Sequence, residues 1–244
     1  MWGLKMGKVI AIVSGKGGTG KTFFTSNLGT YLAMQGKKVV MIDMDFGMRN
    51  LDLYMGMENN VVYNVMDVLS GVCGIKRALI EDKRIPNLFL MSSALCGDTR
   101  DVTELHMKVL CDILKKHFDY ILIDAPAGVG EYFNVACAGA EKAIIITEAE
   151  MASIRDAQVV ESQLRAAGVK DMYCVVNKLK QELATVNIVP KIQEIKDKLN
   201  VPIAGAIQFD TNVCISTNSG KPIVHKKEQY IYKNFSNIAT RIFK

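Results

Sequence analysis

A glycine-rich segment with two lysines lies between an apolar run, residues 8–13, and a segment of helical pattern. It reads Ser14-Gly15-Lys16-Gly17-Gly18-Thr19-Gly20-Lys21-Thr22, and residues 15–22 satisfy every fixed position of the phosphate-binding loop, Gly followed by four free positions and Gly-Lys-Ser/Thr. Glycines allow positive φ angles that turn backbone N–H groups toward an anion at a helix N-terminus. The pattern therefore predicts a nucleoside triphosphate site.

Each polar group of this loop has an expected task. Lys21 supplies a positive charge to the β- and γ-phosphates, and the Thr22 hydroxyl coordinates a magnesium ion. The residues expected to contact the nucleotide through the loop are Gly15, Gly17, Gly18, Thr19, Gly20, Lys21 and Thr22.

An apolar strand that ends in an acid supplies the second metal element. Residues 121–124 read Ile-Leu-Ile-Asp, and Asp124 is expected to hold magnesium directly or through water. Gly128 follows four residues later, where its N–H can face a γ-phosphate and its backbone can move when that phosphate leaves. The two residues together predict a switch.

A second strand end delivers two more carboxylates. Residues 39–45 alternate so that Asp43 and Asp45 point to the same side, at the end of a strand expected next to the loop. Asp43 is expected to support the water shell of the metal. Asp45 is expected to orient the attacking water or to accept a proton from it.

Lys16 has no task in a simple phosphate loop. A second cation near the γ-phosphate stabilises the transition state, but a loop does not easily fold Lys16 back onto its own ligand. A reciprocal arrangement, in which each Lys16 reaches the nucleotide of a twofold-related copy, solves this problem. The two-lysine loop therefore predicts an ATP-bound homodimer.

Apolar runs of strand length alternate with helical segments, which indicates a mostly parallel, twisted sheet with helices on both faces. The expected strands are residues 8–14, 39–43, 88–92, 120–124, 142–147, 172–177 and 201–207. The expected helices are residues 21–35, 102–117, 151–167, 188–199 and 228–243. No linker or repeat is found, so we expect residues 1–244 to form one α/β domain of the P-loop NTPase class.

Composition limits the setting. The longest apolar runs are far shorter than a membrane span of roughly 20 residues, and the N-terminus lacks a signal-peptide core, so a cytoplasmic protein is expected. Six scattered cysteines without a closely spaced pair predict buried thiols. A net charge of +5 does not require nucleic acid or membrane.

The loop with its extra lysine, residues 16–22, resembles the deviant phosphate loop of the MinD/ParA ATPases. Residues 45–59, 124–128 and 153–156 resemble the MinD branch of that family, and the similarity runs from about residue 6 to residue 243. The resemblance implies a slow ATPase whose ATP-dependent dimerisation and hydrolysis recruit a partner protein in division-site placement. It makes Lys16 the lysine that acts across the dimer, Lys21 a phosphate contact and Asp45 the catalytic aspartate.

The resemblance also implies where the adenine ring of the nucleotide binds. Asn177 is implied to meet adenine, and residues 208–211, with Gln208 and Asp210 as contacts, are implied to lie nearby. Residues 177–180 resemble the Asn-Lys-x-Asp sequence that reads guanine, but Lys180 replaces the acid, so ATP is expected rather than GTP. The expected cofactors are thus ATP and Mg²⁺, with Thr22, Asp43 and Asp124 around the metal.

The sequence departs from the family pattern at Phe23, at Gln208, at Gln158, where the family often carries a second acid on its partner surface, and at its end. Phe23 stands where a threonine is usual, so only its backbone is expected to contact the α-phosphate, and Gln208 stands where proline is usual. The family continues into a short basic amphipathic membrane anchor, but the sequence stops at Lys244. Apolar residues at helical spacing in the last helix are expected to pack on the sheet; they are Ile231, Phe235, Ile238 and Ile242.

The sequence leaves alternatives open. A ParA-type partition ATPase would bind DNA, and a flagellar-number regulator belongs to the same MinD-like branch. An electron-transfer ATPase would hold a shared cluster, with Cys96 and Cys137 roughly at the ligand positions. Association with the inner face of the cell membrane also stays open.

Overall fold

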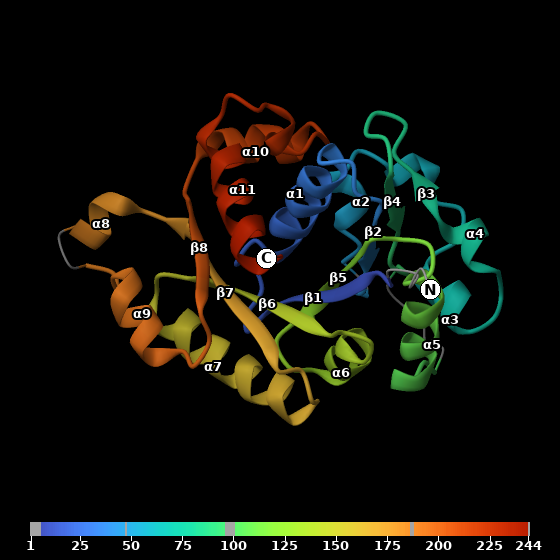
Figure 1. The fold of residues 1–244 in the computed structure, drawn as a ribbon, viewed down its shortest axis with the longest axis horizontal. Coiled ribbons are helices and arrows are strands. Elements are labelled where there is room, and N and C mark those ends of the chain that lie inside the picture. Colours follow the sequence, from blue (N-terminus) through green and yellow to red (C-terminus); the bar gives the residue numbers. More distant parts are fainter. Residues whose placement is uncertain (1–5, 47, 96–100, 186–187, 244) are drawn as a thin grey trace, which may run out of the picture.

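One eight-stranded sheet forms the centre of the molecule (Figure 1). The computed structural model describes residues 6–243 except 47, 96–100 and 186–187. The strands are β1 (Lys8–Ser14), β2 (Val39–Asp43), β3 (Ile80–Glu81), β4 (Leu88–Met91), β5 (Tyr120–Ala127), β6 (Lys142–Glu148), β7 (Asp171–Leu179) and β8 (Ile203–Gln208). Their order is β3-β4-β2-β5-β1-β6-β7-β8, and only β3 runs antiparallel to its neighbour. The predicted α/β fold is confirmed.

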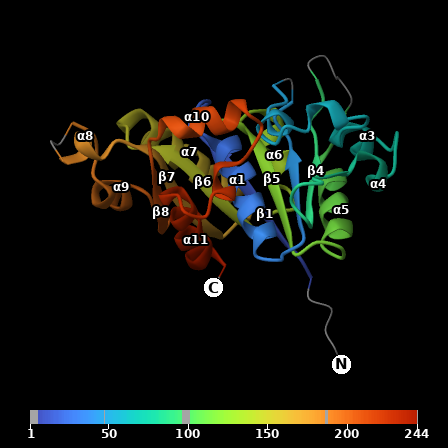
Figure 2. The ribbon, with the colours of Figure 1, turned by 90° about the horizontal axis from the view of Figure 1, so that it is seen from above.

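Helices cover both faces of the sheet. They are α1 (Lys21–Met34), α2 (Leu51–Tyr54), α3 (Val65–Leu69), α4 (Ile75–Ala78), α5 (Glu104–Leu114), α6 (Glu131–Cys137), α7 (Met151–Ala166), α8 (Gln181–Thr185), α9 (Ile192–Lys198), α10 (Thr211–Asn218) and α11 (Tyr230–Ile242). Figures 1 and 2 show α1, α10 and α11 on one side of the sheet, and α5, α6 and α7 on the other.

The core is divided by the sheet because strand side chains alternate between its faces. Val9, Ala11 and Val13 of β1 belong to the hydrophobic cluster beneath α5, α6 and α7. Ile10 and Ile12 belong to the cluster beneath α1 and α11. Burial on both faces explains why the strands read as continuous apolar runs.

The sequence predicted the main helices and strands but neither the short elements nor the order of the strands in the sheet. All seven expected strands and all five expected helices are present, with ends that differ by a few residues. The short β3 and the short helices α2, α3, α4, α6, α8 and α10 were not predicted, because a few residues carry too little periodicity. Strand β2 does not pair with the loop-bearing β1, because β5 lies between them, but Asp45 at the end of β2 still comes within 3.8 Å of the Lys21 ammonium.

Helix α11 packs on the sheet as predicted. Its residues Ile231, Phe235, Ile238 and Ile242 are all buried. Phe235 contacts Phe23 and Phe24 of α1, with ring centroids 6.1 and 5.3 Å apart. The two phenylalanines that follow the loop therefore anchor the last helix. Among the described helices, none combines the length and apolarity needed to cross a membrane.

Candidate functional site

The loop of residues 14–22 joins β1 to α1 at the carboxyl edge of the sheet. Gly18 and Gly20 have φ angles of +82° and +92°, which L side chains rarely adopt. The Thr19 hydroxyl is buried and has no hydrogen-bond partner among the residues that the structure describes. A buried hydroxyl without a partner is costly, so this group is suited to a ligand that approaches the loop.

Lys21 extends from the loop into a group of carboxylates. Its ammonium lies 3.3 Å from Oδ1 of Asp124 and 3.8 Å from Oδ2 of Asp45, with the side chain only 6% exposed. Burial lowers the pKa of Lys21, but the charges of Asp124 and Asp45 outweigh that effect, so the net shift is upward. Lys21 is therefore held as a cation.

Asp124 at the end of β5 organises the base of the site. Its carboxylate accepts hydrogen bonds from Lys21, from the Thr22 hydroxyl at 2.7 Å and from the Thr25 hydroxyl at 3.1 Å. Asp124 is buried, so these three donors satisfy its charge. The contact with Thr22 brings together two of the predicted metal ligands.

Asp43 lies beside Asp124 in the sheet register but has different partners. Its oxygens accept the backbone N–H groups of Asp45 at 2.9 Å and of Leu51 at 3.1 Å. Burial and the neighbouring charge of Asp124 raise the pKa of Asp43 to about 7. The two backbone hydrogen bonds show that Asp43 shapes the turn after β2.

The donor set fits a divalent cation that shares its coordination with a ligand. Three carboxylates, those of Asp43, Asp45 and Asp124, gather near the single ammonium of Lys21. Among the described residues, no three His, Cys, Asp or Glu side chains converge to hold a metal by themselves. Mg²⁺ commonly uses one or two protein oxygens together with phosphate and water. The site thus fits a magnesium–phosphate ligand better than an all-protein metal centre.

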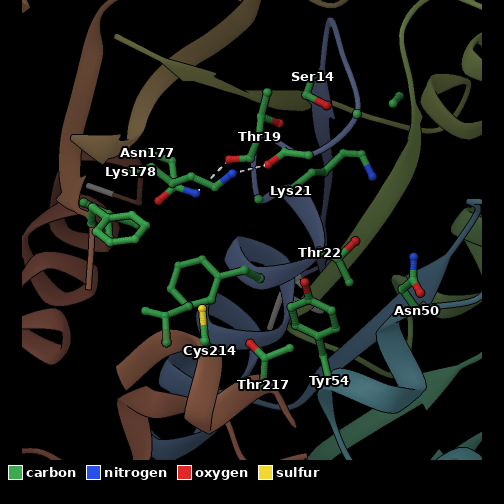
Figure 3. A pocket seen from close by; sticks show the side chains of 18 of the residues that line it. Ser14, Thr19, Lys21, Thr22, Asn50, Tyr54, Asn177, Lys178, Cys214 and Thr217 are labelled. Carbon is green, nitrogen blue, oxygen red and sulfur yellow. Dashed lines mark hydrogen bonds between the residues drawn. The ribbon is translucent and has the colours of Figure 1, made fainter. Parts of the chain in front are cut away.

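A cavity of about 560 Å³ lies between the loop and α10 (Figure 3). It is of the size typical for small-molecule sites. The predicted residues that line it are Gly17, Gly18, Thr19, Gly20, Lys21, Thr22, Phe23, Asp45, Asn177, Gln208 and Asp210. Asp43 and Asp124 are buried and do not line it.

Three other predicted residues lie outside the cavity lining. Gly15 packs on α7, where a Cβ would lie 2.4 Å from Cβ of Asp156, so its glycine serves close packing. The Gly128 N–H donates to the Ser14 carbonyl at 2.8 Å. Lys16 is exposed, and its ammonium donates to Glu150 Oε2 at 3.0 Å. In this chain Lys16 therefore does not face its own cavity.

Asn177 and Lys178 of β7 support the loop from the side (Figure 3). The Asn177 amide donates to the Thr19 carbonyl at 2.8 Å, and Lys178 donates to the Gly18 carbonyl. Lys178 also bonds Glu148 at 3.0 Å. These contacts fix the loop from the far side of β6, a role that spacing alone did not indicate.

The far wall of the cavity comes from elements that were not predicted. The lining residues missed by the sequence include Asn50 and Tyr54 near α2, and Val213, Cys214, Thr217 and Asn218 of α10. The four α10 residues share one helix face. Because the α10 sequence mixes polar and apolar residues without a clear period, only its position after a strand end could have indicated it.

The cysteine positions are as follows. Among the described residues Cys73, Cys111, Cys137 and Cys174 are buried, and Cys214 is exposed. Cys137 lies on α6, whereas Cys96, its expected companion in a shared cluster, lies outside the described residues.

Comparison with known proteins agrees with this geometry. Residues 10–223 match the CobQ/CobB/MinD/ParA nucleotide binding domain family. The chain is 43% identical over 238 residues to the septum site-determining protein MinD of Synechocystis sp., covering 97% of this chain and 90% of that protein.

Solved structures give the same result. The MinC:MinD cell division protein complex of Aquifex aeolicus contains a chain with a TM-score of 0.89 and 36% identity, covering 97% of this chain and 96% of that one. MinD of Pyrococcus horikoshii complexed with Mg-ADP has a TM-score of 0.89 and 29% identity, covering 98% and 97%. The chain therefore belongs to the MinD/ParA family of nucleotide-binding proteins, and within it to the MinD group.

Proposed function

We propose that this protein is a magnesium-dependent ATPase whose ATP-bound form is a homodimer and whose hydrolysis returns it to monomers. The observation that carries this proposal is the opposite placement of two lysines in one loop. Lys21 is buried among carboxylates inside the cavity, whereas Lys16 is 36% exposed and does not line it. A cation presented outside its own site suits a site on another copy.

The loop holds the phosphates. The unpartnered Thr19 hydroxyl, the backbone at Gly18 and Gly20 and the N-terminus of α1 face the approach of an anion. Thr22 and Asp124 would hold the magnesium ion, with Asp43 supporting its water shell, and Mg²⁺ would neutralise phosphate charge. Lys21 is positioned to exchange part of its carboxylate contact for a phosphate oxygen.

Asp45 is the residue we assign to the attacking water. It lines the cavity from the turn after β2, and its carboxylate is partly exposed. The water oxygen forms a bond to the γ-phosphorus while the bond to the β–γ bridging oxygen breaks, and the products are ADP and phosphate. Asp45 accepts a hydrogen bond from this water and orients it, and the water's proton leaves with the phosphate.

In this proposal the adenine ring of ATP lies toward β7 and β8. Asn177, Gln208 and Asp210 line that end of the cavity together with the exposed ring of Phe209. The ammonium of Lys180 lies 5.3 Å from the centre of that ring. A cation at position 180 supplies no acceptor for guanine, which favours ATP.

The proposed biological role is a switch in placing the division septum. Its ATP-bound dimer recruits an effector protein, a proposal supported by the similar Aquifex aeolicus MinD chain, which forms a cell division complex with MinC. The proposed place of action is the cytoplasm, at or near the inner face of the cell membrane.

Sedimentation velocity tests the dimer. The wild-type mass is expected to double with MgATP but not with MgADP. Lys16→Ala is expected to bind ATP within about threefold of wild type yet to lose dimerisation and about 10²-fold or more of hydrolysis, because the cation acts on the partner's nucleotide.

Lys108→Ala is the matched control, since Lys108 is another exposed lysine that pairs with a carboxylate, here Glu104 at 3.9 Å. This variant is expected to behave as wild type. A Lys16→Ala protein that dimerises and hydrolyses ATP at the wild-type rate contradicts the proposal.

A further inference from the structure

A second, larger depression lies away from the nucleotide cavity and shares no lining residue with it. It has a volume of about 850 Å³ and runs between the α3–α4 pair and α5, which Figure 2 shows side by side at one end of the molecule. Its walls are mainly apolar, and Phe89 and Phe118 contribute a pair of rings whose centroids are 5.3 Å apart. We call this depression the α5 groove.

Helix α5 presents apolar residues on two sides. Met107, Leu110, Cys111 and Leu114 are buried against the core, and Leu110 and Leu114 also reach the floor of the α5 groove. Leu105, Val109 and Ile113 line the α5 groove, and they are 66%, 51% and 39% exposed. Spaced four residues apart, they form a stripe about 12 Å long. An apolar stripe in a groove is unusual for a surface without a partner.

The charged side chains that line the α5 groove all have the same sign. Among the described residues they are Lys38, Lys76 and Arg77, joined by His106 and His117, and no carboxylate lines it. Lys38 lies 5.1 Å from the centre of the Phe118 ring. The two acids of α5 pair with lysines that do not line the groove, Glu104 with Lys108 and Asp112 with Lys115.

We propose that the α5 groove binds an acidic amphipathic helix of a partner protein. Helices that dock in grooves insert apolar residues at spacings of three, four and seven, and the stripe of Leu105, Val109 and Ile113 has the matching length. The rim of Lys38, Lys76 and Arg77 selects acidic residues beside those anchors. The proposal does not depend on ATP binding.

Two fluorescein-labelled model peptides of 14 residues test this assignment by fluorescence anisotropy with the full-length protein. Both carry leucine at positions 1, 5, 8 and 12; one carries mainly glutamate elsewhere, and the other mainly lysine. The acidic peptide is expected to bind saturably. Its affinity is expected to fall as the salt concentration rises, because salt screens the charged contacts at the rim. The basic peptide is expected to bind at least tenfold more weakly.

Val109→Glu places an acid inside the α5 groove. It is expected to lower the affinity for the acidic peptide at least tenfold. Val159→Glu is the matched control, because Val159 is 50% exposed on α7 and lies outside the groove. Val159→Glu is expected to bind the peptide as wild type does. ATP binding by both variants is expected to be unchanged.

Four results overturn the proposal. They are no saturable binding of the acidic peptide, equal binding of both peptides, an undiminished affinity in Val109→Glu, and self-association of the protein that Val109→Glu abolishes. The last result would assign the α5 groove to a second copy of this chain.

Discussion

Cys214 is an exposed thiol in the wall of the nucleotide cavity. It lines the cavity from α10 and is exposed. Burial raises the pKa of the Cys111, Cys137 and Cys174 thiols to about 12. Alkylating reagents attack the thiolate, so at neutral pH these three thiols are protected both by burial and by their protonation.

We therefore expect maleimide at pH 7 to label Cys214 much faster than Cys111, Cys137 or Cys174. Saturating MgATP is expected to slow that labelling at least fivefold, because the nucleotide covers the α10 wall. Peptide mass spectrometry measures the rate at each cysteine, and the Cys214→Ser protein provides the background. Unchanged labelling in the presence of bound ATP would show that the nucleotide does not reach α10.

At this scale, the sequence indicated the loop residues well because their spacing is set by local backbone chemistry. It could not reveal that Gly15 packs on Asp156 or that Asn177 holds the Thr19 carbonyl. Both contacts join residues more than 100 positions apart, and only the folded sheet brings them together.

At the scale of elements, the two walls of the cavity are joined behind it. Gly56, just after α2, contacts Gly220, just after α10. Arg84 donates to the carbonyls of Met55 and of Gly220, the latter at 3.0 Å, and pairs with Asp82 at 2.7 Å. This junction fixes the distance between Tyr54 on one wall and Cys214 on the other.

Gly220→Ala is expected to disturb that junction. The new Cβ would lie 2.5 Å from Cα and 2.8 Å from N of Gly56, and φ is +61°. The free energy of unfolding, measured in urea, is expected to fall by more than about 2 kcal/mol. ATP affinity is expected to fall as well, because the two walls must move apart.

Gly36→Ala is the control for this substitution. Gly36 also has a positive φ, +76°, but no atom of the described part of the chain lies within 4 Å of the added Cβ. It is expected to cost about 1 kcal/mol from backbone strain alone and to leave ATP affinity unchanged. Equal effects of the two variants would mean that the Gly56–Gly220 contact does not shape the cavity.

At the scale of the whole molecule, sheet order decides which carboxylate meets the loop. Strand β5 pairs directly with β1 and carries Asp124 against Thr22, while Asp43 on β2 is one strand further away. Apolar runs predicted the strands because each is buried on both faces. Strand order and the placement of α10 depend on long-range packing, which leaves no local pattern in the sequence.

The lifetime of the proposed dimer is a property of the whole molecule. Asp45→Asn keeps the size of the side chain but removes the carboxylate that we propose orients the attacking water. Hydrolysis is expected to fall by about 10²–10⁴-fold, and the MgATP-bound dimer is expected to persist while wild type returns to monomers. Phosphate release and light scattering followed together measure both effects. Rapid dissociation of an Asp45→Asn dimer without hydrolysis would separate the switch from the chemistry.

The pair between Lys16 and Glu150 bears on how readily such a dimer assembles. Both side chains are exposed, at 36% and 55%, and exposed ion pairs contribute only about 0–1 kcal/mol. Breaking this pair to release Lys16 toward a second copy therefore costs little free energy. In the proposed cycle, dimers then form once the concentration of ATP-bound protein in the cell passes a threshold. A modest change in expression level would therefore change the fraction of dimer as effectively as a mutation in the loop.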